Sequence, residues 1–332
     1  MKIIIVGAGA LGAYFGARWH EAGLDVQFLV RNQRAEQLKE NGLLVQSTQG
    51  DYKISQPILV KTADEIDRAD LVFLAVKSYH LNDDLFSTLQ TLVRKGAKVL
   101  PILNGITHID ALRDKLGEEA VLGGLSHIIS TLNERGHVVH SSEQHDLTFG
   151  PLHSSQVEFC EQLHHTFEKA NMNSLVSDDV LLKLWLKYTF INAFSGVTTA
   201  SDLLIGEIRD TEATFELAQE VLNEMKELAN AYDIRLTEEH IENAVVQIHR
   251  FPNDATSSMH RDKQKGLPLE VEHLLGGALN LAKEKELKLP SIRALYALIK
   301  PYETGKKQLD RIALKSNSKE VRDISEKLKR IE

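Results

Sequence analysis

The sequence contains a single cysteine, Cys160, and no long apolar run. One cysteine excludes an intramolecular disulfide and a CxxC metal knuckle, and it favours a reducing compartment, so we expect a cytoplasmic protein. No run approaches the roughly 20 apolar residues of a membrane-spanning helix. Residues 2–12 look like the first element of a fold. We therefore expect neither membrane association nor a cleaved signal peptide.

Concentrated positive charge is also lacking. The 39 Lys and Arg residues stand against 47 Asp and Glu residues, and the formal net charge is −8. Binding of nucleic-acid phosphates requires a dense basic surface, whereas the basic residues of this chain are scattered, so we expect no nucleic-acid partner.

A length of 332 residues with 42% hydrophobic residues fits one large folded domain or two medium ones.

A glycine-rich turn stands near the start of the chain. The β-branched run KIIIV at 2–6 predicts a buried strand, GAGALG follows, and an apolar-periodic segment then predicts a helix. In this arrangement Gly7 permits a tight turn, Gly9 admits a pyrophosphate, and Gly12 lets the helix pack closely. We predict a dinucleotide site formed by Gly7, Ala8, Gly9, Ala10, Leu11 and Gly12.

The predicted strand at 25–30 ends at Arg31. NAD-specific folds usually place an acidic residue there for the ribose 2′-hydroxyl. A guanidinium instead binds a 2′-phosphate through two hydrogen bonds. The sequence therefore favours NADPH, and the alternative for Arg31 is a solvated loop charge.

Further predicted strands at 71–76 and 97–103 indicate a doubly wound α/β sheet. Such folds bind ligands at the carboxyl ends of their strands, where Lys77 and Asn104 stand. Each residue alone could simply end a strand. Together with the glycine turn they indicate a site.

Residues 121–150 alternate apolar and polar side chains around ERG at 134–136. This predicts antiparallel strands that close the sheet, joined by a hairpin. Histidines gather in and near this segment: His137, His140, His145 and His153. Because no acidic or cysteine partner completes a tetrahedral set, we expect solvent-facing histidines and no metal.

A helix is predicted at 155–171 and a short strand at 173–177; beyond them the chain has helical periodicity, and Ser-Asp-Asp at 177–179 is a good helix start. We predict an α/β protein with an N-terminal Rossmann-type dinucleotide-binding domain (1–177) and an all-α C-terminal domain (178–332).

Lys187 lies in a mostly apolar helix, on the face that also carries Ile191 and Ser195. Desolvation would lower its pKa and suit a proton donor; alternatively, its stem covers nearby rings and the ammonium reaches water.

These motifs, with TSSM at 256–259 and Glu270 beyond it, resemble the ketopantoate reductase (2-dehydropantoate 2-reductase) family over nearly the whole chain. The resemblance implies NADPH-dependent reduction of 2-dehydropantoate to (R)-pantoate in pantothenate and coenzyme A biosynthesis. It implies that Lys187 is the general acid and Glu270 a second catalytic residue, which binds the substrate hydroxyl or the lysine. The implied substrate-binding residues are Asn104, Lys187, Ser195 and Ser258, with Ser258 on the carboxylate. The implied cofactor-binding residues outside the glycine turn are Arg31, Lys77, Asn104 and Glu270.

The chain departs from the family pattern beside the lysine. Many members carry asparagines four and eight residues after it, where this sequence has Ile191 and Ser195. A more apolar face should bind the hydroxyl of ketopantoate less well. Reduction of another branched or aryl 2-keto acid, an NAD-dependent hydroxy-acid dehydrogenase, and a catalytically silent NADPH-binding protein therefore stay open. We expect a homodimer, although the charged tail 306–332 equally fits a solvated terminal helix.

Overall fold

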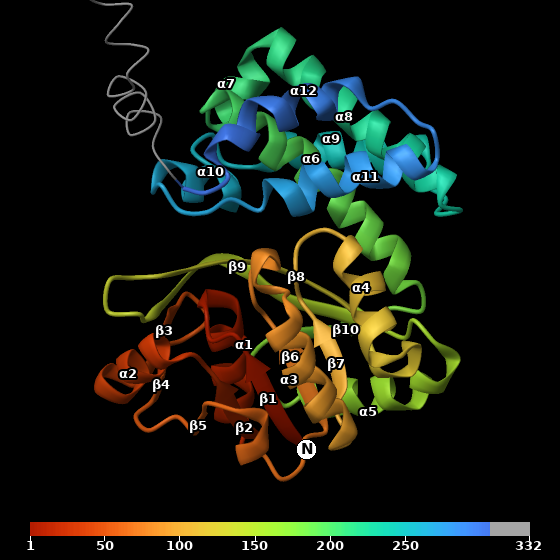
Figure 1. The fold of residues 1–332 in the computed structure, drawn as a ribbon. Helices are drawn as coiled ribbons and strands as arrows, with labels where there is room; N and C mark the ends of the chain where they lie inside the picture. The colour runs from red at the N-terminus through yellow and green to blue at the C-terminus, as the bar shows by residue number, and fades with distance from the viewer. Residues whose placement is uncertain (306–332) are drawn as a thin grey trace, which may run out of the picture. The chain divides into compact units, whose positions relative to one another are not determined.

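The computed structural model describes residues 1–305, so the charged tail lies outside the described residues. The chain divides into two compact units, Met1–Tyr188 and the residues from Thr189 onward. The first unit is α/β and the second is helical (Figure 1). The predicted fold class is confirmed.

A parallel sheet forms the centre of the first unit. Its strands run in the order β5-β2-β1-β6-β7, and every neighbouring pair is parallel. The bounds are β1 (Lys2–Val6), β2 (Asp25–Leu29), β5 (Leu59–Val60), β6 (Leu71–Leu74) and β7 (Lys98–Pro101). This order reverses direction at β1, which confirms the predicted doubly wound sheet. Folds of this kind bind ligands beside such a reversal, at the carboxyl ends of the strands.

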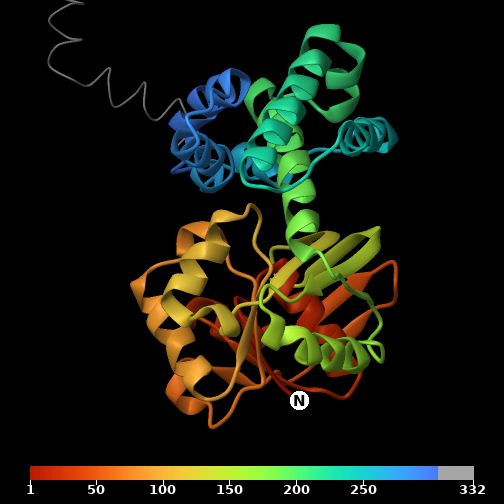
Figure 2. The ribbon, with the colours of Figure 1, turned by 90° about the vertical axis from the view of Figure 1, so that its right-hand side faces the viewer.

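Helices cover both faces of this sheet (Figure 2). Alternate residues of β1 enter different cores, because successive side chains of a strand point to opposite faces: Ile3 and Ile5 join one cluster, and Ile4 and Val6 the other. Helices α1 (Ala10–Glu21) and α5 (Val157–Phe167) contribute to the first cluster. Helices α3 (Asp83–Arg94) and α4 (Thr107–Leu116) contribute to the second, and α2 (Asn32–Asn41) follows β2.

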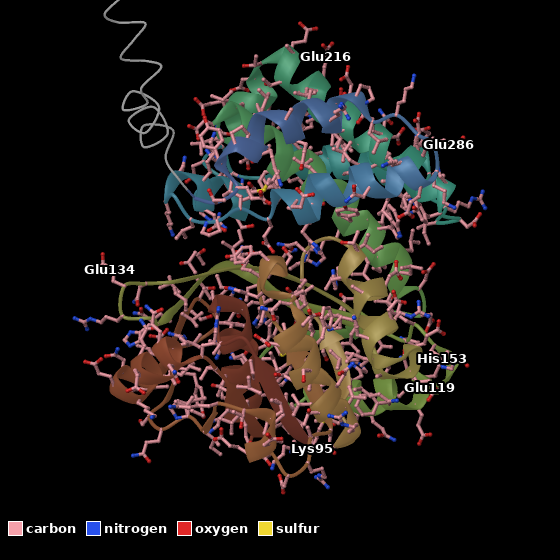
Figure 3. All side chains as sticks on the ribbon, in the orientation of Figure 1. Lys95, Glu119, Glu134, His153, Glu216 and Glu286 are labelled. Atoms are coloured by element: carbon pink, nitrogen blue, oxygen red, sulfur yellow. The ribbon has the colours of Figure 1, made fainter. Side chains whose placement is uncertain are left out.

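A second sheet contains the predicted hairpin. Its order is β10-β9-β3-β4, with β8 antiparallel to β9. The bounds are β3 (Leu43–Ser47), β4 (Tyr52–Ile54), β8 (Gly123–Leu132), β9 (Val138–Gly150) and β10 (Asn173–Val176). Glu134 marks the tip of the hairpin (Figure 3). The prediction that these strands close the parallel sheet is wrong: a single bridge, Val99 to Val121, joins the segment to β7, and the long β9 pairs instead with β3 and β10.

Two of the hairpin histidines do not face solvent as predicted. His140 and His145 are 3% and 7% exposed, because the inner face of β9 packs on α1. His145 Nδ1 lies 2.8 Å from the hydroxyl of Tyr14, and His140 Nδ1 lies 2.7 Å from Ser47 Oγ. Burial lowers the pKa of both imidazoles. Among residues 1–305, no group of His, Cys, Asp and Glu side chains has the arrangement of a metal site.

The division between the units falls inside helix α6 (Val180–Ser201), after Tyr188, rather than after residue 177 as expected. Asp179 Oδ1 accepts the amide hydrogen of Leu182 at 3.0 Å, so the predicted helix start is where the helix begins. The first turns of α6 belong to the α/β unit because Val180 fills the space beside two glycines. A β-carbon at Gly123 would lie 2.5 Å from Val180 Cγ1, and one at Gly150 would lie 3.0 Å from Val180 Cβ.

The second unit continues α6 with a set of helices. Their bounds are α7 (Ile205–Asp210), α8 (Glu212–Ala231), α9 (Glu238–Arg250), α10 (Ser258–Gln264), the π-helix η5 (Glu272–Gly276), α11 (Gly277–Glu284) and α12 (Pro290–Ile299). The carboxylate of Glu224 in α8 accepts the amide hydrogens of Ser291 and Ile292 and so fixes the start of α12. Within the described part of the chain, no helix combines the length and apolarity that crossing a membrane requires.

We expect Gly123→Ala to destabilise the protein by about 1–3 kcal/mol, the usual cost of overpacking a core, because its β-carbon would meet the methyl groups of Val180. Val180→Ala removes those methyl groups, so the double variant should lose less than the sum of the single losses. Urea unfolding of the wild type and the variants measures this coupling. Strictly additive losses would contradict the packing of α6 on β8.

Candidate active site

The glycine turn between β1 and α1 contains two positions that only glycine can occupy. Gly7 has φ +96°, in the left-handed region, and a β-carbon there would lie 2.8 Å from the carbonyl oxygen of Ala75. A β-carbon at Gly12 would lie 2.1 Å from the carbonyl oxygen of Gly7. Both glycines are therefore explained by the backbone fold, before any ligand is considered.

Gly9 is different, because the space beside it is open. It is exposed, and a β-carbon at this position would meet no atom within 4 Å. Gly9 is also the N-cap of α1, where no side chain caps the helix and no acidic residue stands in the first turn. The first amide groups of a helix have no partner inside it and attract negative charge. The turn thus fits a dinucleotide pyrophosphate.

Basic residues lie near this turn, at the ends of the strands that flank β1. Arg31 follows β2 and is exposed, and its Nη2 lies 2.9 Å from Nε2 of His80. His80 ends the short helix η2 (Ser78–His80), which begins directly after Lys77. The structure therefore brings Arg31 to the segment that starts at Lys77. His80 was not predicted, because nothing in its local sequence marks it.

Arg34 forms hydrogen bonds to the glycine turn and to the β8–β9 hairpin. Its Nε donates to the carbonyl oxygen of Ala8 at 2.8 Å, and its Nη1 donates to the carbonyl oxygen of Gly136 at 2.9 Å. Burial lowers its pKa to about 10, which leaves it charged at neutral pH. The glycine turn and the tip of the β8–β9 hairpin are thus held by one guanidinium.

Asn104 stands in the connection from β7 to α4. It is half-buried, and the following Gly105 has φ +83°. Because β7 neighbours β6, Asn104 follows the strand next to the one that ends near Lys77. The predicted first-unit polar positions therefore all follow strands of the central sheet.

Lys187 is half-buried and is held by the backbone of the first unit. Its Nζ donates to the carbonyl oxygen of Ser126 in β8 at 2.8 Å. The next residue in β8, His127, has its pKa lowered to about 4 by burial and by the charge of Lys187, against the opposing effect of Asp146. At neutral pH a neutral imidazole therefore stands in the field of the ammonium. Neither Ser126 nor His127 was predicted, since the acceptor is a main-chain oxygen without a sequence signature.

The other predicted residues belong to the second unit. Ser195 is buried in α6, and Glu270 is buried just before η5, with exposed fractions of 5% and 6%. Ser258 is exposed and is the first residue of α10. Ser257 caps that helix: its Oγ accepts the amide hydrogen of His260 at 3.1 Å and the hydroxyl hydrogen of Thr198 at 3.0 Å. The TSSM segment is thus anchored to α6.

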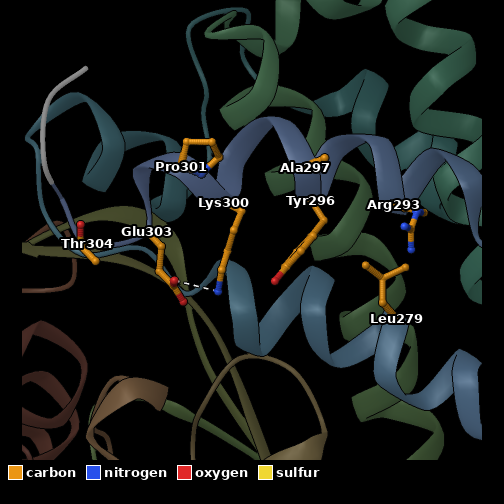
Figure 4. Close-up of a pocket in the computed structure, with 8 residues that line it drawn as sticks. All are labelled: Leu279, Arg293, Tyr296, Ala297, Lys300, Pro301, Glu303 and Thr304. Atoms are coloured by element: carbon orange, nitrogen blue, oxygen red, sulfur yellow. Dashed lines mark ion pairs between the residues drawn. The ribbon is translucent and has the colours of Figure 1, made fainter. Parts of the chain in front are cut away.

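An open hollow of about 570 Å³ also lies in the second unit, between α11 and α12 (Figure 4). Two cationic residues, Arg293 and Lys300, line it, and Lys300 Nζ is paired with Glu303 at 2.8 Å and with Glu272 at 2.5 Å. None of the predicted site residues lines it. It is therefore a surface feature separate from the candidate site.

Comparison with known proteins matches this architecture. The family model described as Ketopantoate reductase PanE/ApbA covers residues 3–154, and its C-terminal counterpart covers residues 179–303. The chain belongs to the ketopantoate reductase family. It is accordingly an oxidoreductase of a family that uses a nicotinamide dinucleotide.

Relatives of this ketopantoate reductase family member cover at least 90% of the chain. The uncharacterized oxidoreductase YkpB of Bacillus subtilis (strain 168) is 33% identical, over 92% of this chain and 100% of the relative. The 2-dehydropantoate 2-reductase of Nostoc sp. (strain PCC 7120) is 27% identical over 90% and 94%. The crystal structure of 2-dehydropantoate 2-reductase from Geobacter metallireducens GS-15 superposes with a TM-score of 0.82 at 25% identity, over 91% and 99% of the chains.

A pair of glycine variants separates folding from cofactor binding. Gly9→Ala should fold like the wild type, because φ −69° suits alanine and no atom crowds the new β-carbon. The methyl group would occupy the space proposed for the pyrophosphate, so NADPH should bind at least about tenfold more weakly, the effect of losing one hydrogen bond to a charged group. Gly12→Ala is the matched comparison and should lower the thermal unfolding temperature. Unchanged NADPH affinity in Gly9→Ala, measured by fluorescence titration, would contradict the assignment of this turn.

Proposed function

We propose that the protein reduces 2-dehydropantoate to (R)-pantoate with NADPH, in pantothenate and coenzyme A biosynthesis, with Lys187 as the general acid. The observation that carries the proposal is the hydrogen bond of 2.8 Å between Lys187 Nζ and the carbonyl oxygen of Ser126. It holds an ammonium, half-buried, in the unit that also carries the glycine turn. Membership of the family and the 2-dehydropantoate 2-reductases among its relatives support the same reaction.

Reduction of a 2-keto acid requires a proton donor at the keto oxygen. When bound, the nicotinamide supplies a hydride to the keto carbon. Negative charge then develops on the carbonyl oxygen, and a positioned ammonium stabilises that charge and donates a proton. Lys187 does this, oriented by Ser126, while neutral His127 adds no competing charge. Asn104 binds cofactor and substrate from the first unit.

The second unit supplies the remaining substrate contacts in this proposal. Ser258 presents an exposed hydroxyl to the substrate carboxylate. Glu270 offers a buried carboxylate, which accepts a hydrogen bond from the substrate hydroxyl or from the lysine. Ser195, buried in α6, is the remaining polar group proposed for substrate binding.

We propose NADPH rather than NADH as the cofactor because of the charge at the end of β2. Arg31 stands where an NAD-specific fold would place a carboxylate. Its guanidinium, beside His80 and the segment that begins at Lys77, suits the doubly charged 2′-phosphate. Glu270 and Asn104 complete the proposed cofactor contacts.

A second candidate substrate class rests on Ile191 and Ser195. Ile191 is half-buried and Ser195 is buried, so α6 offers less hydrogen bonding to a substrate hydroxyl than two asparagines would. The ternary structure of D-mandelate dehydrogenase with NADH and anilino(oxo)acetate has the same fold, with a TM-score of 0.82 at 23% identity over 91% and 98% of the chains. Reduction of a branched or aryl 2-keto acid is therefore the alternative to reduction of 2-dehydropantoate.

We also propose a cytoplasmic homodimer. The one cysteine, Cys160, is buried, and burial raises the pKa of its thiol to about 11, so it stays protonated and unreactive. This is consistent with a reducing compartment. The dimeric ketopantoate reductase from Staphylococcus aureus has the same fold, with a TM-score of 0.75 at 15% identity. Sedimentation equilibrium measures the oligomeric state directly.

Lys187→Gln tests the reaction. We expect kcat to fall by about 10²–10⁴, the usual contribution of a positioned proton donor, with NADPH affinity unchanged. Lys183→Gln is the control, because Lys183 is exposed on the same helix. Nicotinamide absorbance reports turnover of 2-dehydropantoate and of branched and aryl 2-keto acids. A wild type that binds NADPH but reduces no member of this panel would refute the reductase and favour a silent binding protein.

Arg31→Asp tests the cofactor. We expect NADPH to bind at least about tenfold more weakly, since a charge-assisted hydrogen bond is lost and a repulsive carboxylate is gained, while NADH binds no more weakly than before. Lys53→Asp makes the same charge change on an exposed residue of β4 and should leave both affinities unchanged. A wild type that prefers NADH would instead favour an NAD-dependent dehydrogenase.

A further inference from the structure

A fully buried histidine in the second unit has no role in the reaction described above. His260 lies in α10 with an exposed fraction of 0%. Its Nε2 lies 2.7 Å from Oδ1 of Asp202, and its Nδ1 lies 2.5 Å from Oγ1 of Thr256. Nε2 also lies 3.1 Å from the side-chain amide nitrogen of Gln264, so both ring nitrogens contact polar groups.

The partners decide which nitrogen carries the proton. A carboxylate only accepts hydrogen bonds, so Nε2 donates to Asp202, and Nδ1 can then accept the hydroxyl hydrogen of Thr256. A neutral imidazole satisfies both contacts. Asp202 has φ +63°, a left-handed conformation that Asp and Asn tolerate better than other side chains. It follows the last residue of α6, so the imidazole links the end of that helix to residue 256.

Two further hydrogen bonds join the same segments. Thr198 in α6 donates to Ser257 Oγ at 3.0 Å, and Lys263 Nζ in α10 donates to the carbonyl oxygen of Thr199 at 2.8 Å. Together with His260 they tie the end of α6 to both sides of Ser258. Ser258 itself is exposed. A residue held at both ends with its side chain in solvent is suited to present a hydroxyl in a fixed direction.

We propose that His260 is a positioning residue for substrate binding: by bridging Asp202 and Thr256 it fixes the 256–258 turn and directs the hydroxyl of Ser258 toward the carboxylate of the 2-keto acid. The inference rests on the proposed function, because it takes Ser258 as the carboxylate ligand. An apolar side chain could fill the same volume without the cost of desolvating an imidazole. The two directional contacts of the imidazole therefore serve orientation rather than packing alone.

His260→Leu and His260→Gln separate these roles. Leucine fills the space but makes neither polar contact, whereas the glutamine amide can still donate to Asp202. In His260→Leu we expect the KM of the 2-keto acid to rise about tenfold or more, the cost of a misdirected hydrogen bond to a charged group, with kcat and NADPH affinity unchanged. His260→Gln should restore most of the wild-type KM. His249→Leu, at an exposed histidine of the same unit, is the matched control and should behave as the wild type.

Each outcome decides the proposal. If His260→Leu does not fold, Asp202→Ala replaces it in the test. The Asp202 side chain is 59% exposed, so its removal leaves no cavity. A raised KM in Asp202→Ala supports the proposal. A wild-type KM in the leucine or alanine variant overturns it. The proposal is also overturned if the leucine and glutamine variants show the same rise in KM together with the same falls in kcat and NADPH affinity, because that result shows a purely structural role. A wild type without turnover on any 2-keto acid overturns the proposed function as well, which distinguishes the two failures.

Discussion

The hydrogen bond between the Lys187 ammonium and the Ser126 carbonyl oxygen is the interaction on which the functional assignment depends. A half-buried ammonium must replace its lost water with protein acceptors, and β8 provides one because, among the described strands, only β9 pairs with it. The helix start at Asp179 and the glycines that admit Val180 bring the first turns of α6 onto this strand. The position of the ammonium thus follows from packing of small residues far from it in sequence.

The charge of Lys187 also shapes its surroundings. His127 follows the acceptor residue in β8, and the nearby positive charge together with burial keeps its imidazole neutral at physiological pH. Asp146, which lies opposite His127 in the β8–β9 register, opposes this effect without overcoming it. The neutral imidazole of His127 therefore lies in the field of the Lys187 ammonium and adds no competing proton donor in the proposed reaction.

Local features were predictable from the sequence, and long-range partners were not. The β1–α1 turn was predicted from a local pattern: Gly7 and Gly12 meet demands of the backbone fold, and Gly9 leaves open space at the start of the helix. The β8–β9 hairpin was predicted as strands and turn, but alternation does not specify the partner of β9, which pairs with the distant β3 and β10. The same limit explains His140 and His145. The alternating pattern predicted that they lie on strands, but their side chains are buried because they contact Ser47 and Tyr14, which are distant in sequence. Lys187 was found from its helix, whereas its acceptor is a carbonyl oxygen that any residue could supply.

The division of labour between the units bears on substrate identity. The glycine turn, Arg31 and Lys187 all belong to the first unit, so in the proposed reaction the cofactor contacts and the proton donor come from that unit. Ile191, Ser195 and Ser258 belong to the second. In that proposed reaction, side chains of the second unit change which 2-keto acid is bound without altering how hydride and proton are delivered, since kcat/KM discrimination depends on contacts to the part of the substrate that does not react. With Ser258 as the proposed carboxylate ligand, an apolar residue at 191 keeps recognition of the 2-keto acid group and relaxes the requirement for a substrate hydroxyl.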